Sequence, residues 1–557
     1  MSYLSAALDS SWQSTAGFSA LLGLLLHQTI RHLEIDNRGW ELVFTYLGVL
    51  ASLFVNYVTF SSLGVTSALL RTWLAGSAFL LGLYSSMLVY RAFFHQLRRF
   101  PGPFAARLSN AYHMIIIKRT NMRYHRHVQK LHACYGDFVR TGPREISVIR
   151  ASAINLVYGP MSTCEKATWY DQNSGDADKV GIENIRSKEK HRLRRRAWDK
   201  GLGFRALSVY ESRVKAKVDL LLARIGTMEP LNITQQSVFY SFDVMGDIAF
   251  SEDFKMLHTG EEHPAIASLH EAMSIAGLVT TLPWLMNMLR VVPGATGKFE
   301  RFAGWCYEQL RLKRESLAAE RAANSKQEPR DVMTWLIKAM DEGDRSAPPT
   351  ESAIQEDVRT LISAGSDTVA ITFTNTLYFL VKYPAVYQKL QRLMAAEFPS
   401  GYGAWTYEKA KSIPYVDYII HETLRLRPAV PMGFLRQTPP QGLQVDEVFI
   451  PGDTIINVPT YTIHRDERYF EEATEFVPER WETLSPDTAA YLAFQRGPFM
   501  CSGRNLAIMQ LRMLISCLAL RYSIAFAPGE DGVAFADGEK ETLTMWIPPL
   551  QMVFTPL

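Results

Sequence analysis

The chain has 557 residues, which is longer than an ordinary single domain, and it contains no internal repeat or low-complexity linker that would divide it. Its 59 Lys and Arg residues nearly balance 56 Asp and Glu residues, for a net charge of +3, so no global basic field indicates nucleic-acid binding. The five cysteines are odd in number and widely spaced, so neither a disulfide framework nor a zinc site is expected. One large globular domain with an appendage, facing a reducing compartment, fits this composition best.

Two uncharged runs near the N-terminus, residues 42–60 and 72–90, are each nineteen residues long. A helix that crosses a bilayer needs about 20 apolar residues, so both runs are candidate membrane spans. A shorter run, Ala16 to Leu26, is followed by His27, and it leaves two alternatives: a third span over about residues 16–36, or an interfacial segment. A buried core helix is the competing interpretation of the longer runs.

Four basic residues follow the last run: Arg91, His95, Arg98 and Arg99. Because positive residues tend to stay on the cytosolic side of a membrane, we expect everything after them to lie in the cytosol. Residues 100–103 (Phe-Pro-Gly-Pro) stop a helix and predict a hinge between an anchor, residues 1–99, and a domain, residues 100–557. Residues 136–143 and 146–149 have the pattern of two strands around a turn.

Residues 188–198 are dense in charge, which usually indicates a solvated helical face. His191 and Arg195, however, are four residues apart and lie on one face of the expected helix. Two cations placed in this way could reach one pair of carboxylates. Both interpretations stay open for this segment, and the neighbouring arginines 192, 194 and 196 are expected to point elsewhere, toward an acidic partner.

A long helix is predicted from Glu356 to about Leu380, and within it lies Ala364-Gly365-Ser366-Asp367-Thr368. A glycine inside a helix costs about 1 kcal/mol relative to alanine, so a reason for it is expected. We expect Gly365 to leave room for a ligand against the backbone, with the acid of Asp367 and the hydroxyl of Thr368 beside that gap. Hydroxyl bonding to a helix carbonyl is the simpler alternative for Thr368.

Glu422 and Arg425 are spaced three residues apart on another predicted helix, so their side chains can pair. A surface salt bridge is the usual meaning of an isolated E-x-x-R pattern. Arg480, within Phe-Val-Pro-Glu-Arg-Trp at residues 476–481, supplies a second arginine at a suitable distance along the chain. His464 is most simply a structural hydrogen-bonding residue.

Cys501 stands between two glycines, Gly497 and Gly503, at the start of a long apolar run that predicts a helix. The unpaired N–H groups and positive dipole end of that helix favour a thiolate, which can serve as a metal ligand. The glycines let the backbone pass close to a flat, bulky group. An ordinary buried cysteine is the competing interpretation.

The pattern F-x-x-G-x-x-x-C-x-G-x-x-L-A, which begins at Phe494, resembles the haem-thiolate loop of the cytochrome P-450 family. Four motifs occur in the order of that family between residues 364 and 507, and the upstream hinge and anchor resemble those of its membrane-bound members. The resemblance implies a mainly helical fold with small β-sheets, preceded by transmembrane helices. The multi-span anchor and residues 136–143 are most similar to fungal enzymes that tailor secondary metabolites.

The resemblance also implies the roles of individual residues. Cys501 would be the axial iron ligand of a haem b group, with Phe494, Gly503, Ala364 and Gly365 against the cofactor, and Asp367 and Thr368 would relay protons to dioxygen. Haem propionates would be bound by His191, Arg195 and Arg436. A buried structural network would be formed by Glu422, Arg425 and Arg480, and residues 428–434 would form a substrate-facing strand.

Phe499 departs from the family pattern, which has Arg or His at this position. An aromatic ring cannot neutralise a propionate, and a buried carboxylate without a cation costs several kcal/mol. We therefore expect His191, Arg195 and Arg436 to carry more of this task than in relatives that have the usual residue.

The expected activity is insertion of one oxygen atom from dioxygen into a bulky apolar molecule. Electrons would come from NADPH through a separate cytochrome P-450 reductase, with cytochrome b5 as a candidate second partner, because the chain has no G-x-G-x-x-G fingerprint. The expected location is the endoplasmic reticulum membrane. Two alternatives are a haem-thiolate isomerase or dehydratase on the same fold, which Asp367 and Thr368 disfavour, and a non-enzymatic membrane protein, which the absence of spanning runs after Phe100 disfavours.

Overall fold

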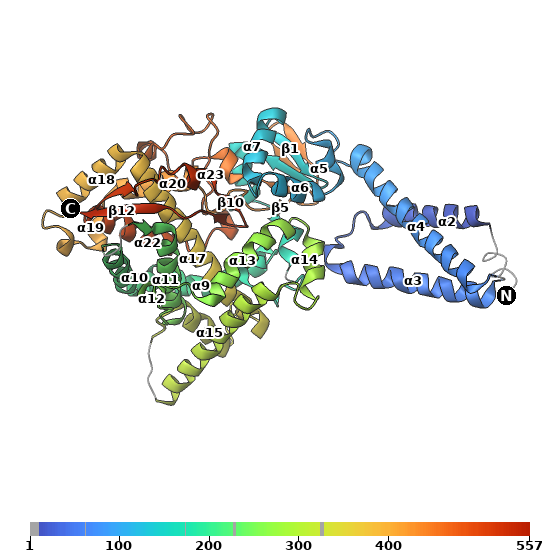
Figure 1. Cartoon of the computed structure of the whole chain (residues 1–557), viewed down its shortest axis with the longest axis horizontal. Coiled ribbons are helices and arrows are strands. Elements are labelled where there is room, and N and C mark those ends of the chain that lie inside the picture. The colour runs from blue at the N-terminus through green and yellow to red at the C-terminus, as the bar shows by residue number, and fades with distance from the viewer. Residues whose placement is uncertain (1–10, 62, 173, 227–229, 324–327) are drawn as a thin grey trace.

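The computed structural model describes residues 11–61, 63–172, 174–226, 230–323 and 328–557, and within them the fold is mostly helical with four small sheets. Three N-terminal helices project away from a globular body, which holds the remaining helices and all the strands (Figure 1). The expectation of a mainly helical fold with small sheets is therefore confirmed.

The three projecting helices are α2 (Trp12–Ile30), α3 (Gly39–Phe60) and α4 (Val65–Val89). In the described residues two stretches are long and apolar enough to span a membrane, Asp36–Phe60 and Val65–Phe94, and α2 is not among them. Helix α2 packs closely along α4: Gly23 has no side chain, and a Cβ atom there would lie only 2.1 Å from the carbonyl oxygen of Phe79. Small residues permit such close helix contacts in membranes. The third span stays a prediction.

The largest sheet has the strand order β1-β2-β8-β5-β3, and the two strands predicted at residues 136–149 are its β1 and β2. The strands are β1 (Phe138–Gly142), β2 (Glu145–Val148), β3 (Glu165–Lys166), β5 (Arg436–Gln437) and β8 (Ile455–Asn457). Strand β3 pairs antiparallel with β5, and Lys166 lies directly opposite Arg436. The sheet thus places two cations side by side at one position.

Residues 428–434, predicted as a strand, form bends and a turn instead. Two of these residues, Pro428 and Pro431, have no N–H to donate to a sheet, and Gly433 adopts a φ of +79° where its Cα approaches the Val458 carbonyl. The prediction of a strand was therefore wrong, although several residues of the segment line the internal cavity described below.

Long helices surround the site. Helix α17 (Glu351–Lys382) contains the predicted long helix and packs along α11 (Ile233–Phe250), while α9 (Lys188–Leu202) contains the charged segment. Helix α20 (Pro414–Leu426) and helix α22 (Arg504–Ala519) pack against α17 and against each other. Other helices include α6 (Ala111–Arg119), α7 (Tyr124–Tyr135), α8 (Ala151–Tyr158), α10 (Phe204–Ile225), α13 (Pro264–Val279), α14 (Pro283–Arg290), α15 (Gly297–Ala322), α16 (Val332–Asp341) and α18 (Pro384–Glu397).

Candidate active site

Cys501 lies in a short loop between the 3-10 turn η7 (Gly497–Phe499) and α22. Its N–H donates to the carbonyl of Phe494 over 3.0 Å, which closes the loop. Gly497 has a φ of +66°, and a Cβ there would lie 2.2 Å from the Tyr158 carbonyl oxygen. Gly497 therefore accommodates the neighbouring backbone rather than a bound group, contrary to expectation, whereas Gly503 has only the Cys501 sulfur near its Cβ position, at 3.9 Å.

A cavity of about 1720 Å³ connects the predicted site residues, and Cys501 lines it. The cavity also reaches apolar side chains of the three N-terminal helices. The predicted residues that line it are His191, Arg195, Ala364, Gly365, Asp367, Thr368, Arg436, Phe494, Cys501 and Gly503. The fold thus brings together side chains that are more than 300 residues apart in the sequence.

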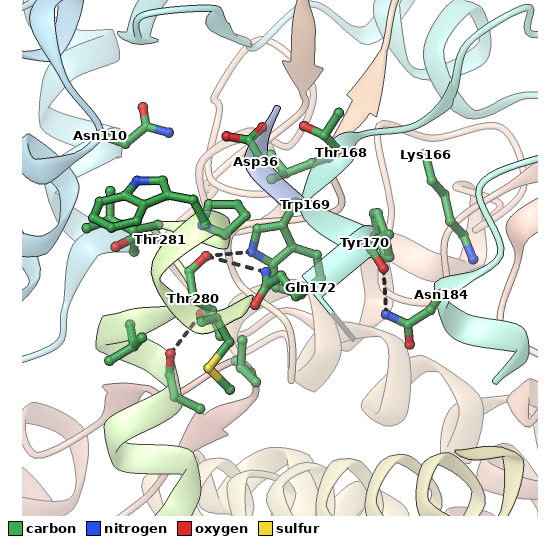
Figure 2. A pocket seen from close by; sticks show the side chains of 18 of the residues that line it. Asp36, Asn110, Lys166, Thr168, Trp169, Tyr170, Gln172, Asn184, Thr280 and Thr281 are labelled. Atoms are coloured by element: carbon green, nitrogen blue, oxygen red, sulfur yellow. Dashed lines mark hydrogen bonds between the residues drawn. The ribbon is translucent and has the colours of Figure 1, made fainter. Parts of the chain in front are cut away.

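A polar wall of this cavity is formed by η3 (Thr168–Gln172) and the end of α13, as Figure 2 shows. The indole N–H of Trp169 donates to the carbonyl of Thr280 over 3.0 Å, and the side-chain amide of Gln172 donates to the same oxygen over 3.4 Å. The amide of Asn184 donates to the carbonyl of Tyr170 over 2.9 Å. These bonds fix the wall beside Lys166.

Burial raises the pKa of the Cys501 thiol above its ordinary value. The backbone N–H groups of Gly503 and Arg504 and the guanidinium of Arg195 lower it, but by less. The N–H groups at the helix start therefore favour the thiolate, as predicted, but their effect on the pKa is smaller than the effect of burial. A bound metal ion displaces a thiol proton outright, so the site favours a thiolate once a metal ligates the sulfur.

Four basic side chains gather at one side of the cavity. Arg436 and Lys166 are buried on adjacent strands, and Lys166 donates to the carbonyl of Glu183 over 2.6 Å. His191 and Arg195 come from α9, where Arg195 donates to the carbonyl of Met500 over 2.5 Å. Burial and the surrounding basic groups lower the pKa of His191 to about 2, and burial and Arg436 lower that of Lys166 well below its ordinary value.

Phe499 lies in the centre of this basic cluster. Its ring centroid is 4.7 Å from the ammonium nitrogen of Lys166 and 4.9 Å from the guanidinium carbon of Arg436, and 4.7 Å from the ring of His191 in an edge contact. The negative face of an aromatic ring attracts cations, so Phe499 stabilises two neighbours that repel each other. A basic residue at this position would instead add a further charge.

The residues present fit a haem group. In the described chain, Lys166 and Arg436 donate to the backbone carbonyls of Glu183 and Leu435 and not to a carboxylate. The Nε atom of Arg436 and the Nδ1 atom of His191 are buried without a hydrogen-bond partner. A buried basic group without a carboxylate partner and a buried donor without an acceptor are both costly, so these groups indicate an anionic ligand. A cofactor with two carboxylates and a metal that accepts a sulfur ligand satisfies both the basic cluster and Cys501.

Helix α17 passes the cavity with Ala364 and Thr368 facing it, and the Thr368 hydroxyl donates to the Ala364 carbonyl over 2.8 Å. The space beside Gly365 is not free, because a Cβ there would lie 2.7 Å from the terminal methyl of Met245. The glycine therefore permits contact with α11, and the expected ligand gap at Gly365 was wrong. Asp367 is buried and bonds to His270 over 3.1 Å.

Glu422, Arg425 and Arg480 form one buried network. The carboxylate of Glu422 accepts two bonds from Arg425, at 2.8 and 2.9 Å, and one from Arg480 at 3.0 Å. It also accepts from the indole N–H of Trp481 over 3.0 Å. The network joins α20 to the segment that precedes the Cys501 loop, and burial lowers the pKa of the adjacent His464 to about 3, so this ring is neutral and bonds to backbone groups.

Two residues of the site, Lys166 and His270, were not predicted from the sequence. Lys166 is part of a two-residue strand with no local motif, and its pairing with Arg436 depends on a register that only the fold defines. His270 lies in a segment of ordinary amphipathic pattern. Arg194 was expected to point outward, but it is buried and paired with Asp357 at 2.5 Å, whereas Arg192 and Arg196 are exposed.

Comparison with known proteins agrees with this site. The cytochrome P-450 family profile matches residues 101–554. The chain is 84% identical over 284 residues to cytochrome P-450 monooxygenase eupD from a Phoma species, which covers 51% of this chain and 100% of that protein. It is 37% identical over 482 residues to cytochrome P-450 monooxygenase orf5 of Eupenicillium brefeldianum, which covers 86% of this chain and 94% of that protein. It is 30% identical over 561 residues to tryprostatin B 6-hydroxylase of Aspergillus fumigatus, which covers 98% of this chain and 97% of that protein.

The chain belongs to the cytochrome P-450 family, whose members bind haem through a cysteine thiolate. Its relatives are monooxygenases of fungal secondary metabolism, and the protein is a haem-thiolate monooxygenase that needs electrons from a redox partner. The expected family, enzyme class and cofactor are therefore confirmed.

Proposed function

We propose that this monooxygenase hydroxylates or epoxidises a bulky apolar small molecule of secondary metabolism. The observation that carries the proposal is a large cavity that is lined by Cys501, by the basic cluster and by the pair Asp367 and Thr368. At about 1720 Å³ it exceeds the roughly 300–1,000 Å³ of ordinary ligand pockets. A relative named for the hydroxylation of tryprostatin B supports this substrate class.

The predicted site residues and Lys166 have different proposed tasks. Cys501 would ligate the iron, and the propionates would be held by Arg436, Arg195, His191 and, in place of the missing basic residue at 499, Lys166. Phe494, Gly503 and Ala364 would lie against the cofactor, whereas Gly365, whose Cβ position is filled by Met245, would not. When bound, the haem supplies the oxidation chemistry, in which one oxygen atom of dioxygen enters the substrate and the other leaves as water.

Asp367 and Thr368 supply protons from α17. The Thr368 hydroxyl faces the cavity and can exchange its bond to Ala364 for one to a water molecule, while the Asp367 carboxyl holds or releases a proton beside it. Glu422, Arg425 and Arg480 are not in this relay. Their task is to fix the backbone that precedes the Cys501 loop, because a buried carboxylate with this many donors holds one geometry.

A separate NADPH-dependent reductase, with cytochrome b5 as a second candidate, is the proposed electron source. The exposed Arg192 and Arg196 on α9 would contact the acidic surface of such a partner. The anchor, residues 1–99, would hold the protein in the endoplasmic reticulum membrane with residues 100–557 in the cytosol. Arg91, Arg98 and Arg99, at the end of the last apolar helix, support that orientation.

The test is turnover of apolar polycyclic compounds by the full-length protein with a reductase, NADPH and isotopically labelled dioxygen. We expect one labelled oxygen atom in a product that forms only with NADPH, and no product from Cys501→Ala. A product that forms without NADPH and without label would contradict the proposal and favour an isomerase or dehydratase.

A further inference from the structure

We propose that His270 is a positioning residue that connects Asp367 to solvent and returns protons to it, and that Glu262 holds the His270 ring in place. This inference rests on the proposed proton-delivery role of Asp367. It adds a path into that residue from the protein surface, which neither the family motif nor the Cys501 loop contains.

The three side chains form a continuous hydrogen-bonded chain. His270 lies on α13, and its Nδ1 atom is 2.8 Å from a carboxylate oxygen of Glu262 in the loop before that helix. Its Nε2 atom is 3.1 Å from a carboxylate oxygen of Asp367 on α17. Phe242 of α11 contacts the imidazole edge to face, with ring centroids 6.0 Å apart. The ring is therefore held on three sides.

Solvent exposure falls along this series of hydrogen-bonded side chains from Glu262 to Asp367. The side chains of Glu262, His270 and Asp367 are 34%, 27% and 10% exposed, and Asp367 lines the cavity that also contains Cys501. The chain therefore runs from the surface to the interior. Since Asp367 is nearly buried, a partner with one side in solvent is the direct way for its carboxylate to regain a proton.

The charged groups that act on His270 are the two carboxylates. From the neighbouring helices, Lys298 of α15 pairs with Glu271 at 2.7 Å, and Arg359 of α17 pairs with Glu356 at 2.9 Å, so both cations are engaged elsewhere. Asp367 and Glu262 raise the pKa of His270 to about 10. The imidazole is therefore protonated at neutral pH.

The proposed path moves one proton at a time from solvent through His270 to Asp367. Monooxygenation consumes protons, because one oxygen atom of dioxygen leaves as water. In the resting ion pair Asp367 is a carboxylate, so the first step breaks the Nε2–H bond of His270 and forms an O–H bond on Asp367. That O–H bond then breaks as the proton passes to an acceptor in the cavity. The neutral ring keeps its Nδ1–H bond to Glu262, and a proton from solvent forms a new N–H bond at Nε2, which restores the imidazolium. No oxidant or further reactant is needed.

The experiment uses the full-length haem-loaded protein with a reductase and NADPH, without added substrate. The rate of NADPH oxidation and the yield of hydrogen peroxide are measured from pH 6.5 to 10 in ordinary and heavy water. The variants are His270→Gln, Glu262→Gln and Asp367→Asn. His258→Gln, an identical change at an exposed histidine outside the cavity, is the matched control.

For His270→Gln we expect a rate about tenfold lower and a larger solvent isotope effect, since a positioned proton donor contributes roughly 10²–10⁴-fold in total. The wild-type rate should fall as the pH approaches 10, and His270→Gln should lack this limb. Glu262→Gln removes one of the charges that raise the pKa of His270, so its limb should move to lower pH. His258→Gln should behave as wild type.

If Asp367→Asn changes the rate and isotope effect while His270→Gln matches wild type in both and in its pH profile, the role of His270 is refuted and that of Asp367 stands. If Asp367→Asn also matches wild type, both proposals are refuted. If His270→Gln fails to fold, the surface variant Glu262→Gln provides the test. An NADPH oxidation rate that falls over the same alkaline pH range as in the wild type would overturn the inference.

Discussion

Lys166→Met tests the proposal that Lys166 replaces the basic residue missing at position 499. The change removes the cation but keeps most of the length of the side chain. Lys166 is buried opposite Arg436, and in the described residues its ammonium group donates to two backbone carbonyls, at 2.6 and 3.4 Å. In the haem-free protein the charge is therefore poorly compensated, and a bound propionate would supply the missing anion.

The magnitude follows from this environment. A hydrogen bond to a charged group contributes about 1.5–3 kcal/mol, which corresponds to roughly 10- to 100-fold in affinity. We expect Lys166→Met to bind haem more weakly by this factor. The haem-free protein should become more stable, however, because a buried cation beside Arg436 is replaced by an apolar chain. Weaker binding combined with a higher haem-free melting temperature distinguishes loss of a ligand from general damage.

The assay is titration of haem into the haem-free, full-length protein, with the exposed Lys190→Met as control. In the wild type, haem binding should restore a proton to Lys166 wherever the pH lies above its lowered pKa in the haem-free protein and below its ordinary value of about 10.4. Affinity should then fall as the pH rises through that window. Lys166→Met should lack this fall in affinity. Cys501 loses its thiol proton on haem binding in both proteins, so that proton does not contribute to the difference between them. Equal affinities and equal pH profiles for Lys166→Met and wild type would refute the reasoning.

Thr368→Ala should retain haem but divert reduced dioxygen into hydrogen peroxide, measured as peroxide formed per NADPH; an unchanged ratio would remove Thr368 from the mechanism. Glu422→Gln leaves two buried arginines without a counter-charge, so we expect about 3–5 kcal/mol less stability by denaturant unfolding, and a loss under about 1 kcal/mol would contradict the buried network. Removal of residues 1–99 should release a folded haem domain into the soluble fraction, and extraction of the intact protein by carbonate alone would argue against membrane insertion.

The sequence predicted local features well. The long helix around Asp367, the charged helix around His191 and the apolar helix after Cys501 all have strong periodicity, and the structure contains them as α17, α9 and α22. The E-x-x-R pair and Arg480 also meet as expected, because their motifs place them on elements whose order along the chain is distinctive.

What the sequence could not predict depends on tertiary contacts. Lys166 becomes important only because β3 pairs with β5, and two-residue strands leave no periodic signal. Gly365 permits packing against Met245, which lies on another helix, and Arg194 turns inward because Asp357 is buried beside α9. The bond between His270 and Asp367 likewise joins residues 97 positions apart.

The most direct test of the central claim is the absorption spectrum of the reduced protein with carbon monoxide, recorded for wild type, Cys501→Ala and Cys134→Ala. Cys134 is an exposed cysteine in α7, outside the cavity lining, and its change serves as the control. We predict that wild type and Cys134→Ala show the red-shifted Soret band of a thiolate-ligated haem and that Cys501→Ala does not. Retention of both haem and that band in Cys501→Ala would contradict the assignment of Cys501 as the iron ligand.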